Sequence, residues 1–182
     1  MLDREQAVLV VVDVQDVLMP KDAPEVVKAF LGNTGKLIET AKCLELPVIV
    51  TEQNPERLGG TNQEIAGVLG DVPRISKLEF NCAANDAFRE ALRATGRRQA
   101  LVLGMETHIC VMQTALGLKE RGYEPYVAVD ATVSMHEAEH KLGIRRIEQE
   151  GVRLVTTQMA IFELLRMAGT PEFKRMLPLL KT

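Results

Sequence analysis

The uninterrupted apolar run from Ala7 to Val12 (AVLVVV) limits the fold of this chain more than any other feature of its sequence. Four of its six residues are valine, a β-branched type that favours strands. Because no polar residue alternates with the apolar ones, the run predicts a strand that is buried on both faces. Strands of this kind belong to parallel sheets that carry helices on each side. We therefore expect an α/β protein.

Four more apolar runs and one weaker, shorter candidate at Arg74–Ser76, separated by segments of helical pattern, extend this expectation to the whole chain. Further strands are predicted at Pro47–Val50, Arg74–Ser76, Gln99–Leu103, Glu124–Val129 and Val152–Val155. Helices are predicted at Pro24–Leu44, with a candidate break at Gly32–Gly35, and at Asn85–Ala94, His108–Arg121, His136–Glu150 and Gln158–Leu180, the last interrupted near Gly169–Pro171. Alternation at this spacing implies right-handed crossovers between parallel strands. The 182 residues predict a single domain, residues 1–182, with a Rossmann-like three-layer αβα fold and a six-stranded parallel sheet covered by helices on both faces.

The composition excludes several classes of partner and indicates a reducing compartment. The formal net charge is −3, aromatic residues make up 4% and tryptophan is absent, so we expect neither nucleic acid nor a membrane surface as a partner. No apolar stretch reaches the length that spans a bilayer, and the first residues lack the features of a signal peptide. Three cysteines, an odd number, do not suggest a disulfide framework. We expect a cytoplasmic protein with reduced thiols.

Polar residues stand at the carboxyl ends of the predicted strands, which is where parallel α/β sheets bind ligands. Asp13 directly follows the first strand, where burial is costly for a carboxylate unless it is paired. It is either a cap for the following turn or a proton carrier. Lys77 follows the third strand and is either a solvated surface lysine or a cation beside a thiolate. Thr51–Pro55, after the second strand, has the composition of a polar loop with a proline turn.

Cys110 is the cysteine best placed for chemistry, because it opens the predicted helix that follows the fourth strand. A helix N-terminus and a neighbouring cation each lower the pKa of a thiol. If Asp13, Lys77 and Cys110 converge, they supply the proton carrier, the cation and the nucleophile of an acyl transfer. The alternative for a cysteine is a plain core position, which Cys43 and Cys82 fit better.

The three histidines are His108, His136 and His140. His136 and His140 are four residues apart and could share one helix face as a metal pair, but their charged Glu-Ala-Glu-His-Lys context favours a solvated face. His108 either lines the site or occupies the first helical turn. No Gly-x-Ser-x-Gly segment is present, so a serine triad is disfavoured.

Several motifs occur in a fixed order along the chain, from about Ala7 to Phe162. They are Val12-Asp13-Val14-Gln15, Val50-Thr51-Glu52-Gln53-Asn54-Pro55 with Leu58-Gly59-Gly60-Thr61, Ser76-Lys77 with Phe80-Asn81, Gly104-Met105-Glu106-Thr107-His108-Ile109-Cys110-Val111 with Gln113-Thr114-Ala115, Gly122-Tyr123, and Val129-Asp130-Ala131 before Ser134. Together they resemble the isochorismatase-like cysteine hydrolase superfamily. The segments after the second strand look most similar to isochorismatase-domain proteins of unassigned substrate.

The resemblance implies a six-stranded parallel sheet and a catalytic triad of Asp13, Lys77 and Cys110. In this triad Cys110 would attack an electrophilic carbon, and Asp13 would carry the proton. Lys77 would stabilise the thiolate and orient Asp13. The resemblance also implies a cis peptide bond between Met105 and Glu106, which would aim the backbone N–H groups of Glu106 and Cys110 at an oxyanion.

The same resemblance bears on cofactors and on the reaction. Nicotinamidases of the superfamily hold a metal with an aspartate and histidines after the second strand, whereas Thr51–Leu69 contains no histidine. We therefore expect no metal and no other cofactor. The isochorismatase reaction cleaves a vinyl ether without needing the thiol. A retained Cys110 therefore favours hydrolysis of a carbon–nitrogen bond in a small amide, ureide or N-carbamoyl compound.

Three alternative functions remain open. A vinyl-ether hydrolase of the isochorismatase type would use Asp13 as its acid. A binding or scaffold protein would keep the fold without activity, although all three triad positions are filled. A redox-responsive thiol protein would oxidise Cys110, but no second cysteine adjoins it in sequence.

The substrate pocket is expected to be lined by eight side chains. These residues are Gln15, Leu18, Glu52, Gln53, Phe80, Met105, His108 and Ile109. If both Glu52 and Glu106 face the pocket, they disfavour an anionic substrate. Family members commonly form oligomers, so the resemblance implies a homo-oligomer. The apolar C-terminal segment either covers the core or forms a subunit contact.

Overall fold

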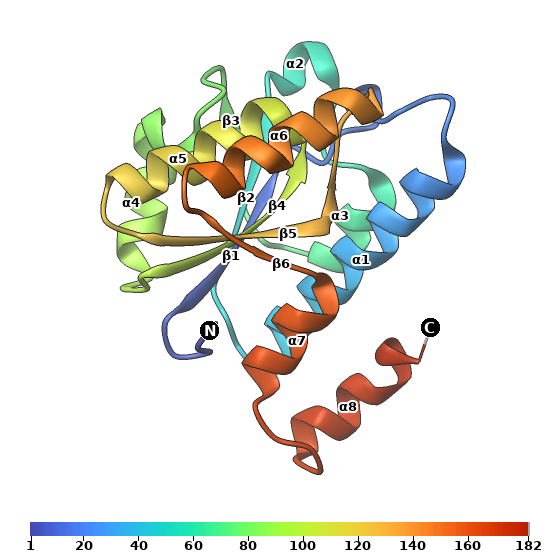
Figure 1. The fold of residues 1–182 in the computed structure, drawn as a ribbon, viewed down its shortest axis with the longest axis vertical. Helices are drawn as coiled ribbons and strands as arrows, with labels where there is room; N and C mark the ends of the chain where they lie inside the picture. The colour runs from blue at the N-terminus through green and yellow to red at the C-terminus, as the bar shows by residue number, and fades with distance from the viewer. Residues whose placement is uncertain (182) are drawn as a thin grey trace.

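The computed structural model describes residues 1–181, in which a six-stranded, wholly parallel sheet has the strand order β3-β2-β1-β4-β5-β6 (Figure 1). The strands are β1 (Ala7–Val12), β2 (Val48–Gln53), β3 (Arg74–Lys77), β4 (Gln99–Met105), β5 (Glu124–Val133) and β6 (Arg153–Val155). The fold class expected from the sequence is confirmed. Several strands extend further toward the carboxyl edge of the sheet than the apolar runs that predict them.

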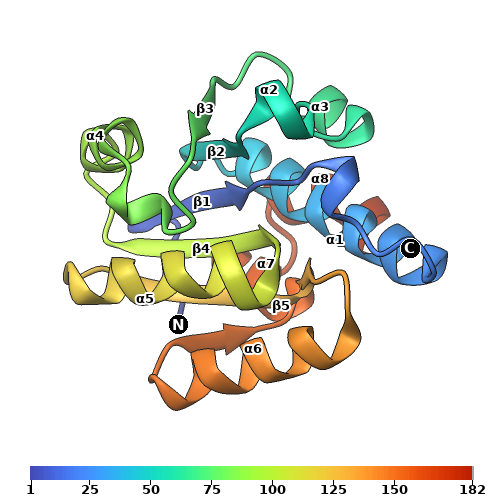
Figure 2. The same ribbon diagram turned by 90° about the horizontal axis from the view of Figure 1, so that it is seen from above.

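Helices cover both faces of the sheet, which gives the three expected layers (Figure 2). Within residues 1–181 the α-helices are α1 (Pro24–Cys43), α2 (Pro55–Leu58), α3 (Gln63–Leu69), α4 (Asp86–Ala94), α5 (Met112–Glu120), α6 (Glu137–Gln149), α7 (Thr157–Leu165) and α8 (Pro171–Leu180). One face carries α1 and α7, with α3 and α8 packed against α1, and the other carries α4, α5 and α6. None of these helices combines the length and the apolar character needed to cross a bilayer.

The strand that opens the chain is the centre of the core. Its side chains alternate between two clusters, with Leu9 and Val11 packed beneath α1 and α7, and Val8, Val10 and Val12 packed beneath α4 and α5. All are at most 1% exposed. Burying each such side chain stabilises the fold by about 1.5–3 kcal/mol relative to leaving it in water. The double burial explains why this segment contains no polar residue.

The first helix differs from its expected form, because α1 runs without a break through Gly32 and Gly35. Its buried side chains include Phe30, Leu37 and Ile38, which recur at helical spacing. This continuous apolar face packs against β5. Its burial outweighs the cost of about 1 kcal/mol that each glycine adds to a helix interior.

Two other helical segments also differ from expectation. The patterns do not predict α3, which begins where the Asn62 side chain accepts hydrogen bonds from the backbone N–H groups of Glu64 and Ile65. The helix expected at His108–Arg121 consists of two parts, a π-helix at Thr107–Val111 followed by α5. The interruption expected in the C-terminal segment is present between α7 and α8.

The C-terminal segment divides its apolar side chains between the core and the surface. Ile161 and Leu164 of α7 are buried against the sheet, whereas Met159, Phe162 and Met167 are about half exposed or more. The segment is therefore compatible with both expected roles. One side of it covers the core, and the other side is exposed to solvent, where a second subunit could contact it.

The strand order places a topological switch point between β1 and β4. The connection from β1 leads to α1 on one face, and the connection from β4 leads to α5 on the other. Ligands in open α/β sheets bind in the crevice outside the carboxyl ends of such strands. Gly104 lets the two strands approach there, because a Cβ atom on this residue would lie 1.9 Å from the carbonyl oxygen of Val12.

Candidate active site

A buried ion pair lies at the switch point. Asp13 follows the last residue of β1 with a φ of 49°, and Lys77 is the last residue of β3. Lys77 Nζ lies 2.6 Å from Asp13 Oδ2, and both side chains are completely buried. Removing two charges from water is costly, so such a pair persists only with good geometry and additional hydrogen bonds. Both residues are therefore paired rather than being a turn cap and a surface lysine.

The additional hydrogen bonds come from β2 and from the segment after β3. Thr51 Oγ1 donates to Asp13 Oδ1 over 2.7 Å. Lys77 Nζ donates to Gln53 Oε1 over 2.7 Å and to the carbonyl oxygen of Glu79 over 3.1 Å. Thr51 and Gln53 are two residues apart on β2, so their side chains leave the same face of the strand. One strand thus supplies a partner to each member of the ion pair.

Cys110 completes the cluster, with its Sγ 3.8 Å from Lys77 Nζ. Only 5% of the residue is exposed. It does not open an α-helix as expected, because it is the fourth residue of the π-helix Thr107–Val111. The wide turn is closed by the N–H of Val111, which donates to the carbonyl oxygen of Glu106 over 3.2 Å. Single π turns of this kind are frequent at functional sites.

The electrostatics of the thiol are opposite to those expected from its position in the chain. Burial raises the pKa of Cys110, the negative charge of Asp13 raises it further, and the cation of Lys77 only partly compensates. The prediction of a lowered thiol pKa is therefore wrong. The pKa of Lys77 is raised: burial acts to lower it, but the combined attraction of Cys82, Asp13 and Cys110 is larger. At neutral pH the cluster thus holds a protonated thiol beside a charged pair.

The peptide bond between Met105 and Glu106, where the resemblance implies a cis bond, is cis. It directly precedes the π-helix that carries Cys110. The Glu106 side chain is tied to the next loop, because its Oε1 accepts a hydrogen bond from the N–H of Met135 over 3.0 Å. This carboxylate therefore has a structural partner at the end of β5.

Several polar residues predicted to face a substrate make hydrogen bonds within the protein instead. Gln15 donates to the carbonyl oxygens of Gln53 and Gly59, and its Oε1 accepts from the N–H of Gln53 over 2.7 Å. Glu52 Oε1 accepts from both the N–H and the hydroxyl of Thr61, at 2.7 and 2.6 Å. These bonds hold the Leu58–Thr61 loop against the end of β2. Substrate contact by these side chains stays a prediction.

The other predicted pocket residues differ in exposure. Met105 is completely buried, and Leu18 packs against the cluster beneath α1. Ile109 packs against the opposite cluster, while Phe80 is 53% exposed in the segment after β3. Nδ1 of His108 lies 3.0 Å from the hydroxyl of Ser134. Of this set, Phe80 is the side chain most open to solvent.

Sequence patterns miss three residues, of which Thr51 and Cys82 lie beside Asp13 and Ser134 lies beside His108. The composition of Thr51–Pro55 predicts only a polar loop, yet the Thr51 hydroxyl donates a hydrogen bond to Asp13. Cys82, assigned to plain core, has its Sγ 3.7 Å from Thr51 Oγ1, and burial raises its pKa to about 11. Ser134 bonds His108 from the end of β5. Thr51 and Ser134 both lie within the motifs of the family resemblance and near strand ends, and this placement could have identified them as site residues.

The solvated face expected for His136 and His140 holds for His136 but not for His140. His140 is partly buried, and its Nδ1 lies 2.9 Å from the hydroxyl of Thr107 at the start of the π-helix. His136 is exposed and precedes the first residue of α6. Within the part of the chain that the structure describes, no three His, Cys, Asp or Glu side chains are grouped so that they could hold a metal ion.

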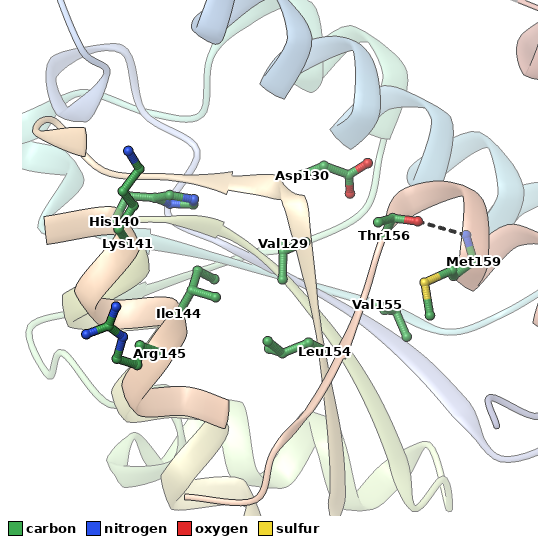
Figure 3. A pocket seen from close by; sticks show the side chains of 10 residues that line it. All are labelled: Val129, Asp130, His140, Lys141, Ile144, Arg145, Leu154, Val155, Thr156 and Met159. Atoms are coloured by element: carbon green, nitrogen blue, oxygen red, sulfur yellow. Dashed lines mark hydrogen bonds between the residues drawn. The ribbon is translucent and has the colours of Figure 1, made fainter. Parts of the chain in front are cut away.

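A cavity of about 650 Å³ lies away from the triad, between α6 and the start of α7 at the β6 edge of the sheet (Figure 3). Ile144 of α6 and Leu154 of β6 point toward one another across it, and His140 contributes to its wall. Its lining contains no cysteine. A smaller cavity of about 310 Å³ lies at the carboxyl end of β5, where Ser134 lines it.

Comparison with known proteins gives consistent matches. Residues 7–159 match the family model of the isochorismatase domain. The secreted isochorismatase effector Isc1 of Phytophthora sojae is 35% identical over 181 residues, which span 96% of this chain and 84% of that protein. Among solved structures, the MAR1 ribonuclease of Caenorhabditis elegans has a TM-score of 0.88 and 29% identity, covering 100% of this chain and 92% of that one. YcaC of Escherichia coli, described as an octameric hydrolase of unknown specificity, has a TM-score of 0.82 and 27% identity, covering 98% and 86%.

Proposed function

This chain belongs to the isochorismatase family, and from that premise we propose that it is a cofactor-free cysteine hydrolase of a small amide, ureide or N-carbamoyl compound. One observation supports the proposal most strongly. A thiol, a carboxylate and an ammonium group meet in one buried cluster at the topological switch point, formed by Cys110, Asp13 and Lys77. These are the groups that acyl transfer to a thiol requires.

In the proposed first step Cys110 is the nucleophile and Asp13 is the base. Because burial keeps the Cys110 thiol protonated through its raised pKa, the nucleophile forms only when that proton moves to Asp13. Sγ then bonds to the carbonyl carbon, and the carbonyl oxygen becomes an oxyanion. The backbone N–H groups of Glu106 and Cys110 are the proposed donors to that oxyanion.

The intermediate then collapses, and the carbon–nitrogen bond breaks. The leaving nitrogen takes the proton from Asp13, and a thioester to Cys110 remains. Water attacks this thioester, giving a proton to Asp13, and the carbon–sulfur bond breaks. Asp13 returns the proton to sulfur, so the net reaction consumes one water and regenerates the thiol.

Lys77 has two proposed roles in this sequence. Its Nζ lies 2.6 Å from Asp13 Oδ2, which favours the ionised base, and 3.8 Å from Cys110 Sγ, which favours the transient thiolate. Its raised pKa keeps it charged at neutral pH. The lysine thereby offsets the negative charge that develops on sulfur as the proton leaves.

We propose a small-molecule substrate rather than RNA, although three structural neighbours are named as ribonucleases or putative ribonucleases. RNA binding depends on basic surface and on aromatic side chains that stack on bases. This chain has a net charge of −3 and 4% aromatic residues. The absence of histidine from Thr51–Leu69 supports a reaction that needs no metal.

We further propose that the protein acts in the cytoplasm as a homo-oligomer. A free thiol nucleophile persists best in a reducing compartment. The half-exposed side chains Met159 and Phe162 give α7 an apolar surface suited to a subunit contact. Light scattering after gel filtration would measure the assembly, and a monomer at all concentrations would contradict this part of the proposal.

The test is a screen of small amides, ureides and N-carbamoyl compounds against the wild-type protein and Cys110→Ala. Cys43→Ala is the matched control, because Cys43 is a partly exposed thiol at the end of α1. We expect turnover by wild type and by Cys43→Ala and none by Cys110→Ala. Mass spectrometry of quenched reactions should find an acyl adduct on Cys110.

Other outcomes separate the alternatives. Turnover of a vinyl ether that survives Cys110→Ala would replace the thioester mechanism with acid catalysis by Asp13. Cleavage of RNA by wild type, with no turnover of any carbon–nitrogen compound, would overturn the substrate class. No turnover of any class, with no adduct, would favour a binding protein that keeps the fold.

A further inference from the structure

A chain of hydrogen bonds behind Asp13 includes a buried thiol that the proposed mechanism does not use. Cys82 begins the 3₁₀ helix Cys82–Ala84 and is completely buried. Its Sγ lies 3.7 Å from Thr51 Oγ1, which lies 2.7 Å from Asp13 Oδ1. The three groups come from the segment after β3, from β2 and from the end of β1. The contact is therefore made by the fold and not by neighbours in sequence.

The direction of each hydrogen bond follows from counting protons. Asp13 is ion-paired with Lys77, so its carboxylate is ionised and can only accept. The single hydroxyl proton of Thr51 is therefore donated to Asp13. The Thr51 oxygen can then only accept from Cys82, which makes the Cys82 S–H the donor. Burial keeps this thiol protonated, with a pKa of about 11.

We propose that Thr51 and Cys82 are positioning residues that fix the Asp13 carboxylate for proton transfer from Cys110. Lys77 holds Oδ2 and Thr51 holds Oδ1, so the plane of the carboxylate cannot turn. The S–H of Cys82 in turn orients the Thr51 hydroxyl. The inference rests on the proposed function, in which Asp13 is the base.

The positioning also sets how much negative charge faces Cys110. Each donor to the carboxylate spreads its negative charge. Without the Thr51 hydroxyl, Asp13 repels the thiolate of Cys110 more strongly. Lys77, Cys82 and Asp13 are the charged or titratable groups that act on this thiol. A purely structural Thr51 would affect folding stability but not the reactivity of Cys110.

The experiment measures the rate at which iodoacetamide alkylates Cys110, with peptide mass spectrometry separating its adduct from those of Cys43 and Cys82. Between about pH 7 and 9 the rate follows the small thiolate fraction, so a tenfold change corresponds to about one pKa unit. We expect Thr51→Val to react about tenfold more slowly, since a hydrogen bond to a charged group has roughly that effect. Cys82→Ala should be slowed by a smaller factor.

Conservative variants and a matched control isolate the hydrogen bonds from the packing. Thr51→Ser and Cys82→Ser keep the donors and should react at close to the wild-type rate. Thr34→Val makes the same exchange at a buried threonine of α1, whose hydroxyl has no partner among residues 1–181. It should leave the alkylation rate unchanged.

Two results would overturn the inference. One is an equal rate for wild type and Thr51→Val, and the other is equal slowing by Thr51→Ser and Thr51→Val. If circular dichroism shows that Thr51→Val does not fold, Cys82→Ala against Cys82→Ser carries the test, and equal rates would overturn it. The assay needs no substrate, so a failed substrate screen counts against the proposed function alone.

Discussion

The two ends of the carboxyl edge of the sheet treat polar groups in opposite ways. At the ends of β1, β2 and β3, Asp13 and Lys77 are completely buried and fully paired. At the β5–β6 end, the charged residues Lys141 and Arg145 are exposed around a wider cavity with apolar walls (Figure 3). The cavity of about 650 Å³ is therefore not where Asp13, Lys77 and Cys110 meet. Buried, mutually bonded charge identifies the candidate active site better than cavity volume does.

The largest expected effect tests this contrast by removing one cation from each end. Lys77→Met leaves the Asp13 carboxylate buried without its partner and should lower the free energy of unfolding by about 3–5 kcal/mol. Arg145→Met removes an exposed guanidinium for which residues 1–181 offer no bonded partner, and should change it by less than about 0.5 kcal/mol. Urea unfolding followed by circular dichroism measures both. Similar losses in the two variants would erase the distinction between the ends.

The next prediction concerns stability at alkaline pH and the end of the sheet edge that holds Asp13 and Lys77. The pKa of Cys82 is about 11 in the folded protein against an ordinary 9.0, so between these values the folded state holds a proton that the unfolded state has lost. The unfolding free energy must therefore fall as pH rises through this window, by about 2–3 kcal/mol for this thiol. The raised pKa values of Cys110 and Lys77 act in the same direction.

Cys82→Ser isolates the contribution of that thiol, because a serine hydroxyl does not titrate in this range. From pH 8 to pH 11 the unfolding free energy of wild type should fall by about 2–3 kcal/mol more than that of Cys82→Ser. Urea unfolding of both proteins at each pH measures this. Parallel curves across this range would contradict the prediction.

A third prediction concerns the contact that joins the two ends. Helix α6 forms a wall of the wide cavity and also packs against the π-helix of Cys110. Gly143 lies at that contact, where a Cβ atom would come within 2.8 Å of the Cα of His108. Gly143→Ala should therefore destabilise the protein by about 1–3 kcal/mol, because relieving the clash requires a shift of the π-helix backbone at His108.

Gly67→Ala is the matched control for this substitution. Gly67 is an exposed position of α3 with no atom within 4 Å of an added Cβ, so alanine should stabilise the helix by about 0.5–1 kcal/mol. Thermal unfolding of both variants gives the comparison. The two substitutions should change stability in opposite directions, and a Gly143→Ala protein as stable as wild type would show that the added methyl group does not clash with the π-helix.

The smallest expected effect is a change in stability at acidic pH, and it concerns His140 at the β5–β6 end. Burial lowers the pKa of His140 below its ordinary 6.5, while Glu137 and Lys141 act on it in opposite directions. Below pH 6.5 the unfolded state thus binds a proton that the folded state does not, so stability falls as the pH falls. His140→Gln should reduce the loss of melting temperature between about pH 7 and 5. If the melting temperature of His140→Gln falls as much as that of wild type, His140 is not the cause of the loss.

Most of the sheet could be predicted because its strands, except β3, contain local apolar runs. Ala7–Val12 and Gln99–Met105 are buried along their whole length, so their sequences contain the signal. The ends of β2 and β5 could not, because they continue through polar residues such as Glu52 and Asp130. Pairing with neighbouring strands, rather than local preference, extends them.

The site was predictable only in part, for a related reason. Asp13 and Lys77 are 64 residues apart, and no local pattern encodes their contact, so their pairing was inferred from the family resemblance. The direction of the Cys110 pKa was wrong because its cause is burial by distant segments. The contact of Cys82 with Thr51 was missed because it joins two separate connections of the sheet.

The central place of β1 has a consequence for synthesis on the ribosome. Ala7–Val12 pairs with β4, whose first residue lies about ninety positions later in the chain. At the usual 5–20 residues per second, the nascent strand waits for roughly 5 to 20 seconds before that partner emerges. During this time it is a short, uncharged, strongly β-prone segment of the kind that self-associates. The strand at the centre of the mature core is thus a segment that can self-associate while the chain is being synthesised, until β2 and β4 have both emerged.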